Sequence, residues 1–254
     1  MISKSKMASV LLILIFIAAA CEQKTPDTEA SATEASQNEA AAAQVEPVAT
    51  EEAPKAPRLI EAKATADDLI GVLPEGVGIE VGQPMPEIEV QNAEAVAVNL
   101  NALAAEGPIL LVFYRGGWCP FCNFQIRELT LAHAQFDERG VTPVAISVDR
   151  IEEASKTQQA YTIPFPVLSD PDLIAHKGFR VINEVAEQES AKLKMMGMDL
   201  EASSGRQHST VAIPGVFLID KEGVVRWAHA NADYRARPSI EQLLAAIDGA
   251  SLAP

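Results

Sequence analysis

The sequence predicts an α/β domain in which a central mixed sheet is flanked by helices. Residues 109–114 are a run of mostly β-branched or aromatic apolar side chains that ends at a glycine turn, as a buried strand does. Residues 123–138 follow with apolar side chains at helical spacing. Strand-like and helix-like segments then alternate as far as a hairpin at 216–228, which is typical of a layered α/β fold. The 254 residues, 48% of them hydrophobic, suffice for one large domain or two small ones.

The chain begins with the pattern of an export signal, which we assign to residues 1–21. Two lysines precede an apolar run at 7–20, and Cys21 follows directly. Small residues before a cysteine resemble the lipobox of bacterial lipoproteins, in which the cysteine is acylated after cleavage. The resemblance implies a lipid on Cys21 and a place on the periplasmic side of a bacterial membrane, with Glu22 slightly favouring the outer membrane. The alternatives are a secretory signal cut after Ala20 and an uncleaved anchor.

Residues 22–60 are expected to form an acidic linker without regular structure. They contain no aromatic side chain, so they cannot bury enough apolar area to offset the entropy of ordering. Residues 22–57 hold eight acidic residues and two lysines, within a formal charge of −15 for the whole chain. This charge argues against nucleic acid as a partner and leaves the lipid anchor as the expected membrane contact. Residues 61–254 are the expected folded domain, an α/β domain with an N-terminal extension.

The elements expected ahead of the central strand are short. A helix is predicted at 65–71, and a turn-rich entry at 81–86 leads into a strand at 87–91. A second strand at 95–100 and a helix at 101–105 complete this half.

After the central strand and its helix, strands and helices continue to alternate. Residues 183–210 are charged and rich in methionine, and we expect an insertion with some helix there. The other expected elements are a strand at 141–148, a helix at 151–161, a short strand and turn at 164–170, a helix at 171–177, hairpin strands at 216–220 and 224–228, and a closing helix at 240–247.

The strongest chemical signal is the pair Cys119 and Cys122, placed where the loop after the central strand meets a helix. Free N–H groups and the dipole at a helix N-terminus favour thiolate. Residues three apart on a first turn also lie close enough for a disulfide. Pro120 suits that turn, since its missing N–H costs nothing there. The pair predicts a redox dithiol, with Cys119 expected to be the more exposed. No Cys/His cluster completes a zinc site, so no cofactor is expected.

Residues 113–122, Phe-Tyr-Arg-Gly-Gly-Trp-Cys-Pro-Phe-Cys, resemble the peroxiredoxin-like branch of the alkyl hydroperoxide reductase/thiol-specific antioxidant (AhpC/TSA) family. Segments 81–86, 164–170 and 233–237 agree with this resemblance, which covers about residues 78–248. It implies a thioredoxin-like fold and thiol-dependent reduction of peroxides or disulfides.

The thioredoxin-like resemblance also gives roles to residues around the pair. In that fold a cis-proline before a sheet strand faces the two cysteines, and Pro214, after Ile213, stands at this place. The resemblance therefore implies substrate contacts by Ile213, Pro214 and Pro120, with Trp118 as a flat flanking surface. The alternatives are a trans-proline that opens an edge strand and a tryptophan that only packs.

The sequence departs from the family at the reactive centre. Peroxiredoxins carry Pro-x-x-x-Thr-x-x-Cys, in which the cysteine attacks peroxide. On this chain that cysteine is Cys122, the threonine is replaced by Cys119, and the proline is replaced by Arg115. Arg115 is thus a candidate substrate contact. Four arginines are candidates for the positive charge that the site needs: Arg115, Arg206, Arg226 and Arg237.

The expected function is a membrane-tethered thiol-dependent redox enzyme that reduces peroxides or protein disulfides and is recycled by a thioredoxin-like electron donor. In peroxiredoxin-like chemistry Cys122 attacks and Cys119 resolves, whereas thioredoxin-like chemistry exchanges these roles. The alternatives are a disulfide oxidoreductase without peroxidase activity, a Sco-like copper protein with His208 as a ligand, and a structural disulfide, which closes too short a loop to stabilise much.

Overall fold

The computed structural model describes residues 58–250 and residue 252. The expected signal at 1–21, the lipidation at Cys21 and nearly all of the 22–60 linker lie outside the described residues, so these stay predictions. Among the described residues, no helix combines the length and the apolar content that a bilayer crossing requires.

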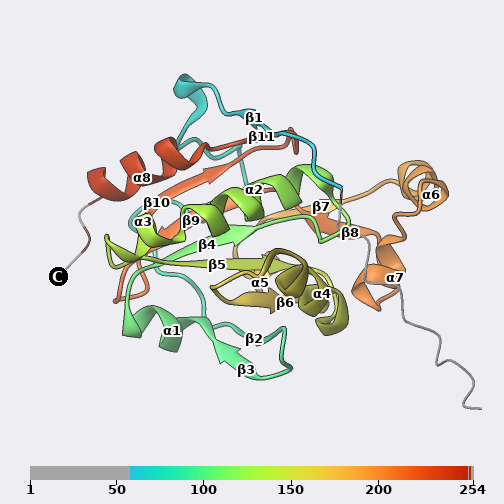
Figure 1. Ribbon diagram of the computed structural model, residues 1–254, viewed down its shortest axis with the longest axis horizontal. Helices are drawn as coiled ribbons and strands as arrows, with labels where there is room; N and C mark the ends of the chain where they lie inside the picture. Colours follow the sequence, from blue (N-terminus) through green and yellow to red (C-terminus); the bar gives the residue numbers. More distant parts are fainter. Residues whose placement is uncertain (1–57, 251, 253–254) are drawn as a thin grey trace, which may run out of the picture. The chain divides into compact units, whose positions relative to one another are not determined.

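A seven-stranded mixed sheet forms the centre of the domain, in the order β10-β9-β4-β5-β6-β2-β3 (Figure 1). β4 runs parallel to β5 and antiparallel to β9, so the sheet mixes both directions. The predicted α/β class with a central mixed sheet is therefore confirmed. The strands of this sheet are β2 (Glu89–Asn92), β3 (Ala97–Asn99), β4 (Ile109–Phe113), β5 (Thr142–Ser147), β6 (Val167–Ser169), β9 (Gly215–Ile219) and β10 (Val225–Ala230).

Strand β4 is buried at all five residues, because it lies inside the sheet with core on both faces. Leu110 and Val112 belong to one hydrophobic cluster, whereas Ile109, Leu111 and Phe113 belong to the cluster on the opposite face. The uninterrupted apolar run in the sequence is thus what a strand covered on both faces requires.

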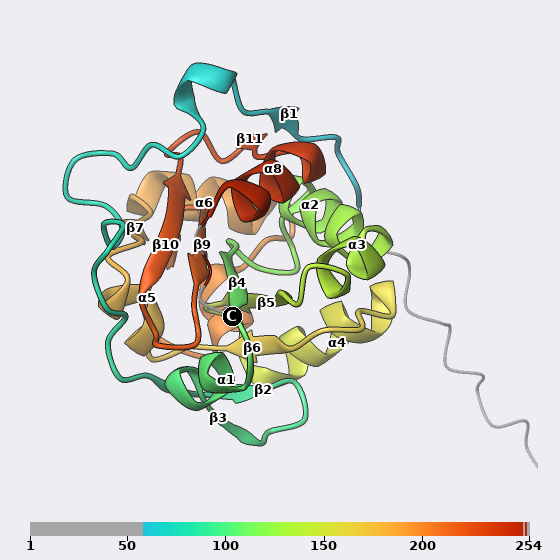
Figure 2. The ribbon, with the colours of Figure 1, turned by 90° about the vertical axis from the view of Figure 1, so that its left-hand side faces the viewer.

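Helices cover the two faces of this sheet, with α2, α3 and α4 to one side and α5 to the other in Figure 2. The helices that share the core of Leu110 and Val112 are α2 (Pro120–Leu131), α3 (His133–Asp137), α4 (Ile151–Tyr161) and α8 (Ile240–Gly249). Those that share the opposite core are α1 (Leu100–Glu106) and α5 (Ile174–Gly178).

The helix predicted at 123–138 is in fact two helices and begins earlier. α2 starts at Pro120, with Cys119 as its N-cap residue, so both cysteines belong to its first turn. At Ala132 the backbone leaves helical geometry, with φ −92° and ψ 4°, and the short α3 follows. Leu129 and Phe136 are both fully buried and keep a helical spacing across this break, so the apolar pattern could not reveal it.

The insertion predicted at 183–210 holds two helices, α6 (Glu187–Met195) and α7 (Leu200–Ser204). An antiparallel pair that the sequence did not indicate closes its base, formed by β7 (Ile182–Glu184) and β8 (Thr210–Ala212). The helix predicted at 65–71 is a single 3-10 turn, η1 (Asp67–Leu69), too short to bury any residue.

A second small sheet joins the two ends of the domain. β1 (Lys63–Ala64) pairs in parallel with β11 (Ala236–Arg237), which lies between the hairpin and α8. The N–H of Ile60 also donates to the carbonyl oxygen of Pro120 at 3.3 Å. The chain around residues 60–64 is therefore held against the first turn of α2, where the cysteines lie.

Candidate active site

A tight loop connects the end of β4 to the first turn of α2. Gly116 lies in this loop with φ 144°, a value that favours glycine. A Cβ atom there would lie 2.4 Å from Trp118 Nε1 and 2.7 Å from Asp149 Oδ1. The glycine thus lets an indole and a carboxylate approach the loop from two sides just before Cys119.

The two cysteines form a close, enclosed pair. Their Sγ atoms lie 2.6 Å apart, and both are free cysteines. Cys119 is 1% exposed and Cys122 is 0% exposed. The difference in exposure expected between the two cysteines is thus only 1% against 0%, because both are enclosed. The N-cap position puts Cys119 against the core, where it packs in the same cluster as Cys122.

Arg237, on β11, supplies the positive charge next to the pair. Its Nη2 donates to Cys122 Sγ at 3.4 Å, and its side chain is almost wholly buried. Burial alone would raise the pKa of Cys122, but the hydrogen bond with Cys119 and the charge of Arg237 outweigh it and lower that pKa to about 6. The same hydrogen bond, together with burial, raises the pKa of Cys119. Cys122 is therefore the more acidic of the two cysteines, and once it is ionised Cys119 is the thiol that can donate to its sulfur.

The other three arginine candidates have different neighbours. Arg206 pairs with Asp172, and Arg226 pairs with Asp220, so neither is free to serve the cysteines. Arg115 is buried, and its guanidinium carbon lies 4.2 Å from the ring centre of Tyr234 and 5.1 Å from that of Trp118. Its charge lowers the pKa of Cys122 by a smaller amount than Arg237 does. Arg115 therefore makes cation–π contacts with two aromatic rings beside the site and adds positive charge to it.

Trp118 links the site to the insertion. Its half-buried ring packs against both the cluster that contains the two cysteines and the cluster formed by Val185, Leu193, Leu200 and Val211. The tryptophan thus packs at this junction, and its ring also lies against the guanidinium of Arg115. Pro120 occupies the first position of α2 as expected.

Ile213 and Pro214 lie at the same edge of the sheet as the cysteine loop. Gly215 is the register partner of Phe113, the last residue of β4, so Pro214 is placed beside the start of the loop. The Ile213 N–H donates to Val181 O at 2.8 Å, and Pro214 O accepts from the Asn231 N–H at 3.0 Å. Both residues are therefore fixed by backbone hydrogen bonds near the site, which leaves their proposed contacts with substrate to be tested.

Asp149 is a member of the site that the sequence analysis missed. Its buried carboxylate accepts from the Gly117 N–H at 2.7 Å and from the Ser147 hydroxyl at 3.0 Å. Desolvation raises the pKa of Asp149 to about 7 despite these hydrogen bonds. The signal that could have found it is its place two residues after the end of the buried strand β5, which is parallel to β4, because such strand ends meet at one edge of a sheet.

His208, the candidate copper ligand, has protein partners for both ring nitrogens. Nε2 is 2.9 Å from Pro171 O, and Nδ1 accepts from the Thr210 N–H at 3.3 Å. In the part of the chain that the structure describes, no three His, Cys, Asp or Glu residues are grouped as metal ligands.

Comparison with known proteins identifies relatives of this arrangement. The profile of the AhpC/TSA family matches residues 81–228. The chain is 28% identical to Peroxiredoxin 2 of Sulfuracidifex metallicus over 152 residues, or 57% of this chain and 60% of that protein. It is 23% identical to the 1-Cys peroxiredoxin PER1 of Hordeum vulgare over 113 residues, or 42% of this chain and 51% of that protein. The chain thus spans about half to three fifths of the length of these relatives.

Solved structures agree in fold. Reduced Prx3 of Vibrio vulnificus in complex with H₂O₂ superposes with a TM-score of 0.55 at 18% identity, covering 66% of this chain and 99% of that one. The peroxidoxin BcpB of Mycobacterium tuberculosis gives a TM-score of 0.53 at 17% identity, covering 68% and 97%. These likenesses confirm the thioredoxin-like fold. Since the family profile also covers more than half of the sequence, the chain belongs to the AhpC/TSA family.

Proposed function

We propose that the chain is a thiol-dependent peroxidase in which Cys122 attacks the peroxide and Cys119 resolves the product. One observation carries the assignment of roles: Cys122 Sγ lies 3.4 Å from Arg237 Nη2 and 2.6 Å from Cys119 Sγ. A cation beside one sulfur and a thiol beside the same sulfur make Cys122 both the nucleophile and the atom to be resolved.

The proposed reaction has two steps within the protein. The Cys122 thiolate attacks a peroxide oxygen and the O–O bond breaks, which leaves a sulfenic acid on Cys122. The departing oxygen takes a proton and leaves as water or an alcohol. The Cys119 thiol then attacks the sulfenic sulfur, water is released, and a Cys119–Cys122 disulfide forms.

Enclosure of the pair favours a small oxidant as the first substrate. With both cysteines almost fully buried, a protein disulfide could reach them only if the first turn of α2 opened, whereas a peroxide is small enough to need less movement. A thioredoxin-type donor is the proposed reductant, since exchange with its dithiol restores both cysteines and oxidises the donor. This second exchange requires the first turn of α2 to open.

We also propose that the protein acts from a lipid anchor on Cys21 at the periplasmic side of a bacterial membrane. The support is the sequence pattern of residues 1–21 alone. The linker that follows would allow the domain to move relative to the anchor.

Mass spectrometry of the peroxide-treated protein tests the assignment. Wild-type protein should lose two hydrogens as the Cys119–Cys122 disulfide forms. Cys119→Ser should stop at a sulfenic acid on Cys122, which a dimedone-type reagent traps. Cys122→Ser should give neither product. A sulfenic acid on Cys119 in that last variant would reverse the roles of the two cysteines. A Cys119→Ser protein that does not react with peroxide would reject the peroxidase and favour the alternative of a disulfide oxidoreductase.

A further inference from the structure

The peptide unit of Gly117, just before the cysteine pair, is held from both sides by buried side chains. Its N–H donates to Asp149 Oδ2 at 2.7 Å, and its carbonyl oxygen accepts from Asn123 Nδ2 at 2.8 Å. Asp149 lies beyond the end of β5, whereas Asn123 belongs to α2 and directly follows Cys122. We call Asp149, Gly117 and Asn123 the Gly117 clamp, since together they tie the loop both to the edge of the sheet and to the helix of the cysteines.

Asn123 also holds Cys119 directly. Its backbone N–H donates to the carbonyl oxygen of Cys119 at 3.0 Å, while its side chain reaches Gly117. The N–H of Cys119 in turn donates to the carbonyl oxygen of Gly116 at 3.0 Å. One residue of α2 thus fixes the chain on both sides of Trp118, and this fixed chain carries the sulfur of Cys119.

The loop needs such a clamp because its two consecutive glycines give the backbone little stiffness of its own. Glycine is nevertheless required at position 117, since a Cβ atom there would lie 2.1 Å from Thr157 Oγ1. The position of Cys119 relative to Cys122 therefore depends on the hydrogen bonds of the clamp, because the loop residues themselves restrict the backbone so little.

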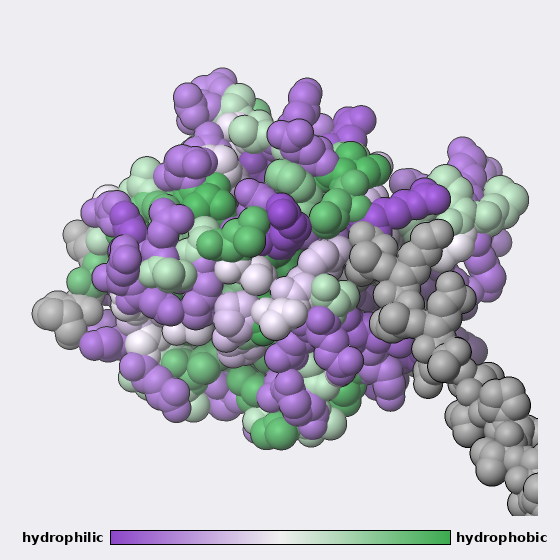
Figure 3. Space-filling view, viewed as in Figure 1, coloured by the Kyte–Doolittle hydropathy of each residue, from purple (hydrophilic) through white to green (hydrophobic). Residues whose placement is uncertain are grey.

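Stability alone does not explain the clamp. Polar side chains usually lie on the outside of a domain, and hydrophilic residues cover much of the face in Figure 3, whereas Asn123 is 1% exposed and Asp149 is 0% exposed. Each of the two keeps its buried Oδ1 atom without a protein partner among the described residues. Burial of such atoms is costly, so the fold accepts a loss of stability to hold this peptide unit in place.

We propose that Asn123 is a positioning residue for the resolving step, with Asp149 as its anchor at the edge of the sheet. The Sγ atoms of Cys119 and Cys122 lie 2.6 Å apart before oxidation, and the clamp keeps Cys119 facing its partner once the sulfenic acid has formed. Cys119 then bonds to the sulfenic sulfur as the S–O bond breaks, and the thiol proton leaves with the hydroxyl group as water. Such an attack is fast only while the reacting atoms stay close and aligned. The inference rests on the proposed peroxidase function and adds the residues that position its second step.

Replacement of the Asn123 amide in the full-length reduced protein tests this role. In Asn123→Leu the Gly117 carbonyl oxygen loses its donor, so the first-order rate constant of disulfide formation should fall about tenfold or more. The second-order rate constant of the first step with H₂O₂ should stay nearly unchanged, since Arg237 still contacts Cys122. Quenched-flow mass spectrometry measures both, and the longer-lived sulfenic acid should give more sulfinic acid at high peroxide. Asn123→Ala, which needs no additional room, should behave in the same way.

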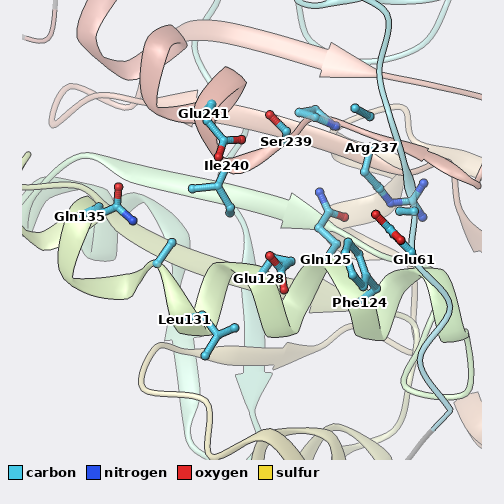
Figure 4. Close-up of a pocket in the computed structure, with 14 residues that line it drawn as sticks. Glu61, Phe124, Gln125, Glu128, Leu131, Gln135, Arg237, Ser239, Ile240 and Glu241 are labelled. Carbon is cyan, nitrogen blue, oxygen red and sulfur yellow. The ribbon is translucent and has the colours of Figure 1, made fainter.

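Gln125→Leu is the matched control. Gln125 is a second buried amide of α2, 4% exposed, and it lines a pocket of about 380 Å³ between α2 and α8 (Figure 4). The described residues that line this pocket include neither Asn123 nor the two cysteines. Loss of the amide at position 125 should therefore leave both rate constants unchanged. If Gln125→Leu slows disulfide formation as much as Asn123→Leu does, the specific role of Asn123 is overturned.

The anchoring role of Asp149 can be tested by rescue. Asp149→Leu removes the acceptor for the Gly117 N–H and should slow disulfide formation. Asp149→Asn keeps an oxygen at that place and should restore most of the lost rate. A rate that is as low in Asp149→Asn as in Asp149→Leu would contradict the anchoring role, because the carboxylate itself would then be required.

A reaction without peroxide separates this inference from the proposed function. Methyl methanethiosulfonate transfers a methylthio group to the thiolate of Cys122 and releases methanesulfinate; attack by Cys119 then closes the disulfide and expels methanethiol. This closure should also be about tenfold slower in Asn123→Leu. Slow closure in the variant, with no reaction of the wild type with peroxide, would retain the positioning role and reject the peroxidase. Peroxide turnover by the wild type, with equal closure rates in both proteins, would retain the peroxidase and reject the positioning role.

Discussion

In the proposed reaction, the reactivity of Cys122 depends on one residue, Arg237. One guanidinium nitrogen donates to Cys122 Sγ, and another donates to the carbonyl oxygen of Ala236 at 2.8 Å. The guanidinium is almost fully buried, so its charge acts on the sulfur with little screening by solvent. The thiolate on Cys122 therefore depends on a residue 115 positions away in the chain.

Arg237→Gln should raise the pKa of Cys122 from about 6 by roughly 1–3 units, because the burial that opposes ionisation stays while the cation is lost. The oxidation rate of the wild type should rise with pH through about 6 and then level off. In the variant this midpoint should move upward and the rate at neutral pH should fall about tenfold. Titration of the ultraviolet absorbance of the thiolate measures the pKa of Cys122 in both proteins. The exposed Arg235→Gln is the control, and an equal shift there would discredit a specific role for Arg237.

Asp149 is expected to make the free energy of unfolding depend on pH. Desolvation raises its pKa to about 7, above that of an unfolded carboxyl. Its stabilising contribution is thus full at low pH and is lost as pH rises through 7. Relative to Asp149→Asn, the free energy of unfolding of the wild type should fall by on the order of 4 kcal/mol between about pH 4 and 7. Urea unfolding of both reduced proteins across this range tests it, and parallel curves would disprove it.

Some residues of the candidate site could be predicted from the sequence, and others could not. The CxxC pair and its place at a helix N-terminus follow from local pattern, and the need for a nearby positive charge follows from the family resemblance. The choice of Arg237 among four candidates does not, because the other three differ only in tertiary partners such as Asp172 and Asp220. Asp149 was missed for the same reason, since its hydrogen bond to Gly117 joins positions 32 residues apart.

At the scale of elements, long periodic segments were predictable and short paired ones were not. β4, α4 and the β9–β10 hairpin have enough residues to show a period or an unbroken apolar run. β1 and β11 have two residues each, and their pairing joins Lys63 with Ala236. No local sequence pattern predicts this pairing, although the pairing holds the strand that carries Arg237.

Truncations that end on either side of β1 test the role of this pairing. Removal of residues 1–57 should leave unfolding and peroxide reactivity unchanged, because the contacts of Ile60 and β1 remain. Removal of residues 1–66 deletes β1 and should free β11, which raises the pKa of Cys122 and slows oxidation at neutral pH. The two proteins can be compared by urea unfolding and by the thiolate titration. If both behave like the full chain, β1 has no part in holding Arg237.

For the molecule as a whole, the proposed lipid anchor on Cys21 would determine where the protein works. Cys21→Ala should release the protein from membranes while leaving the reaction of Cys119 and Cys122 with peroxide unchanged, since Cys119, Cys122 and Arg237 lie far from Cys21 in the sequence. Fractionation of cells that express each form measures this, and metabolic labelling with a fatty acid reports acylation. A Cys21→Ala protein that stays in the membrane fraction would indicate an uncleaved leader.

In the proposed mechanism, Cys122 is a peroxide-reactive thiolate activated by the protein around it. The most direct test is the second-order rate constant of Cys119→Ser with H₂O₂ at neutral pH, in a variant whose serine hydroxyl can still donate to Cys122. We expect a rate constant far above that of free cysteine, and one that falls when Arg237→Gln is added. A rate constant no greater than that of free cysteine would contradict the claim.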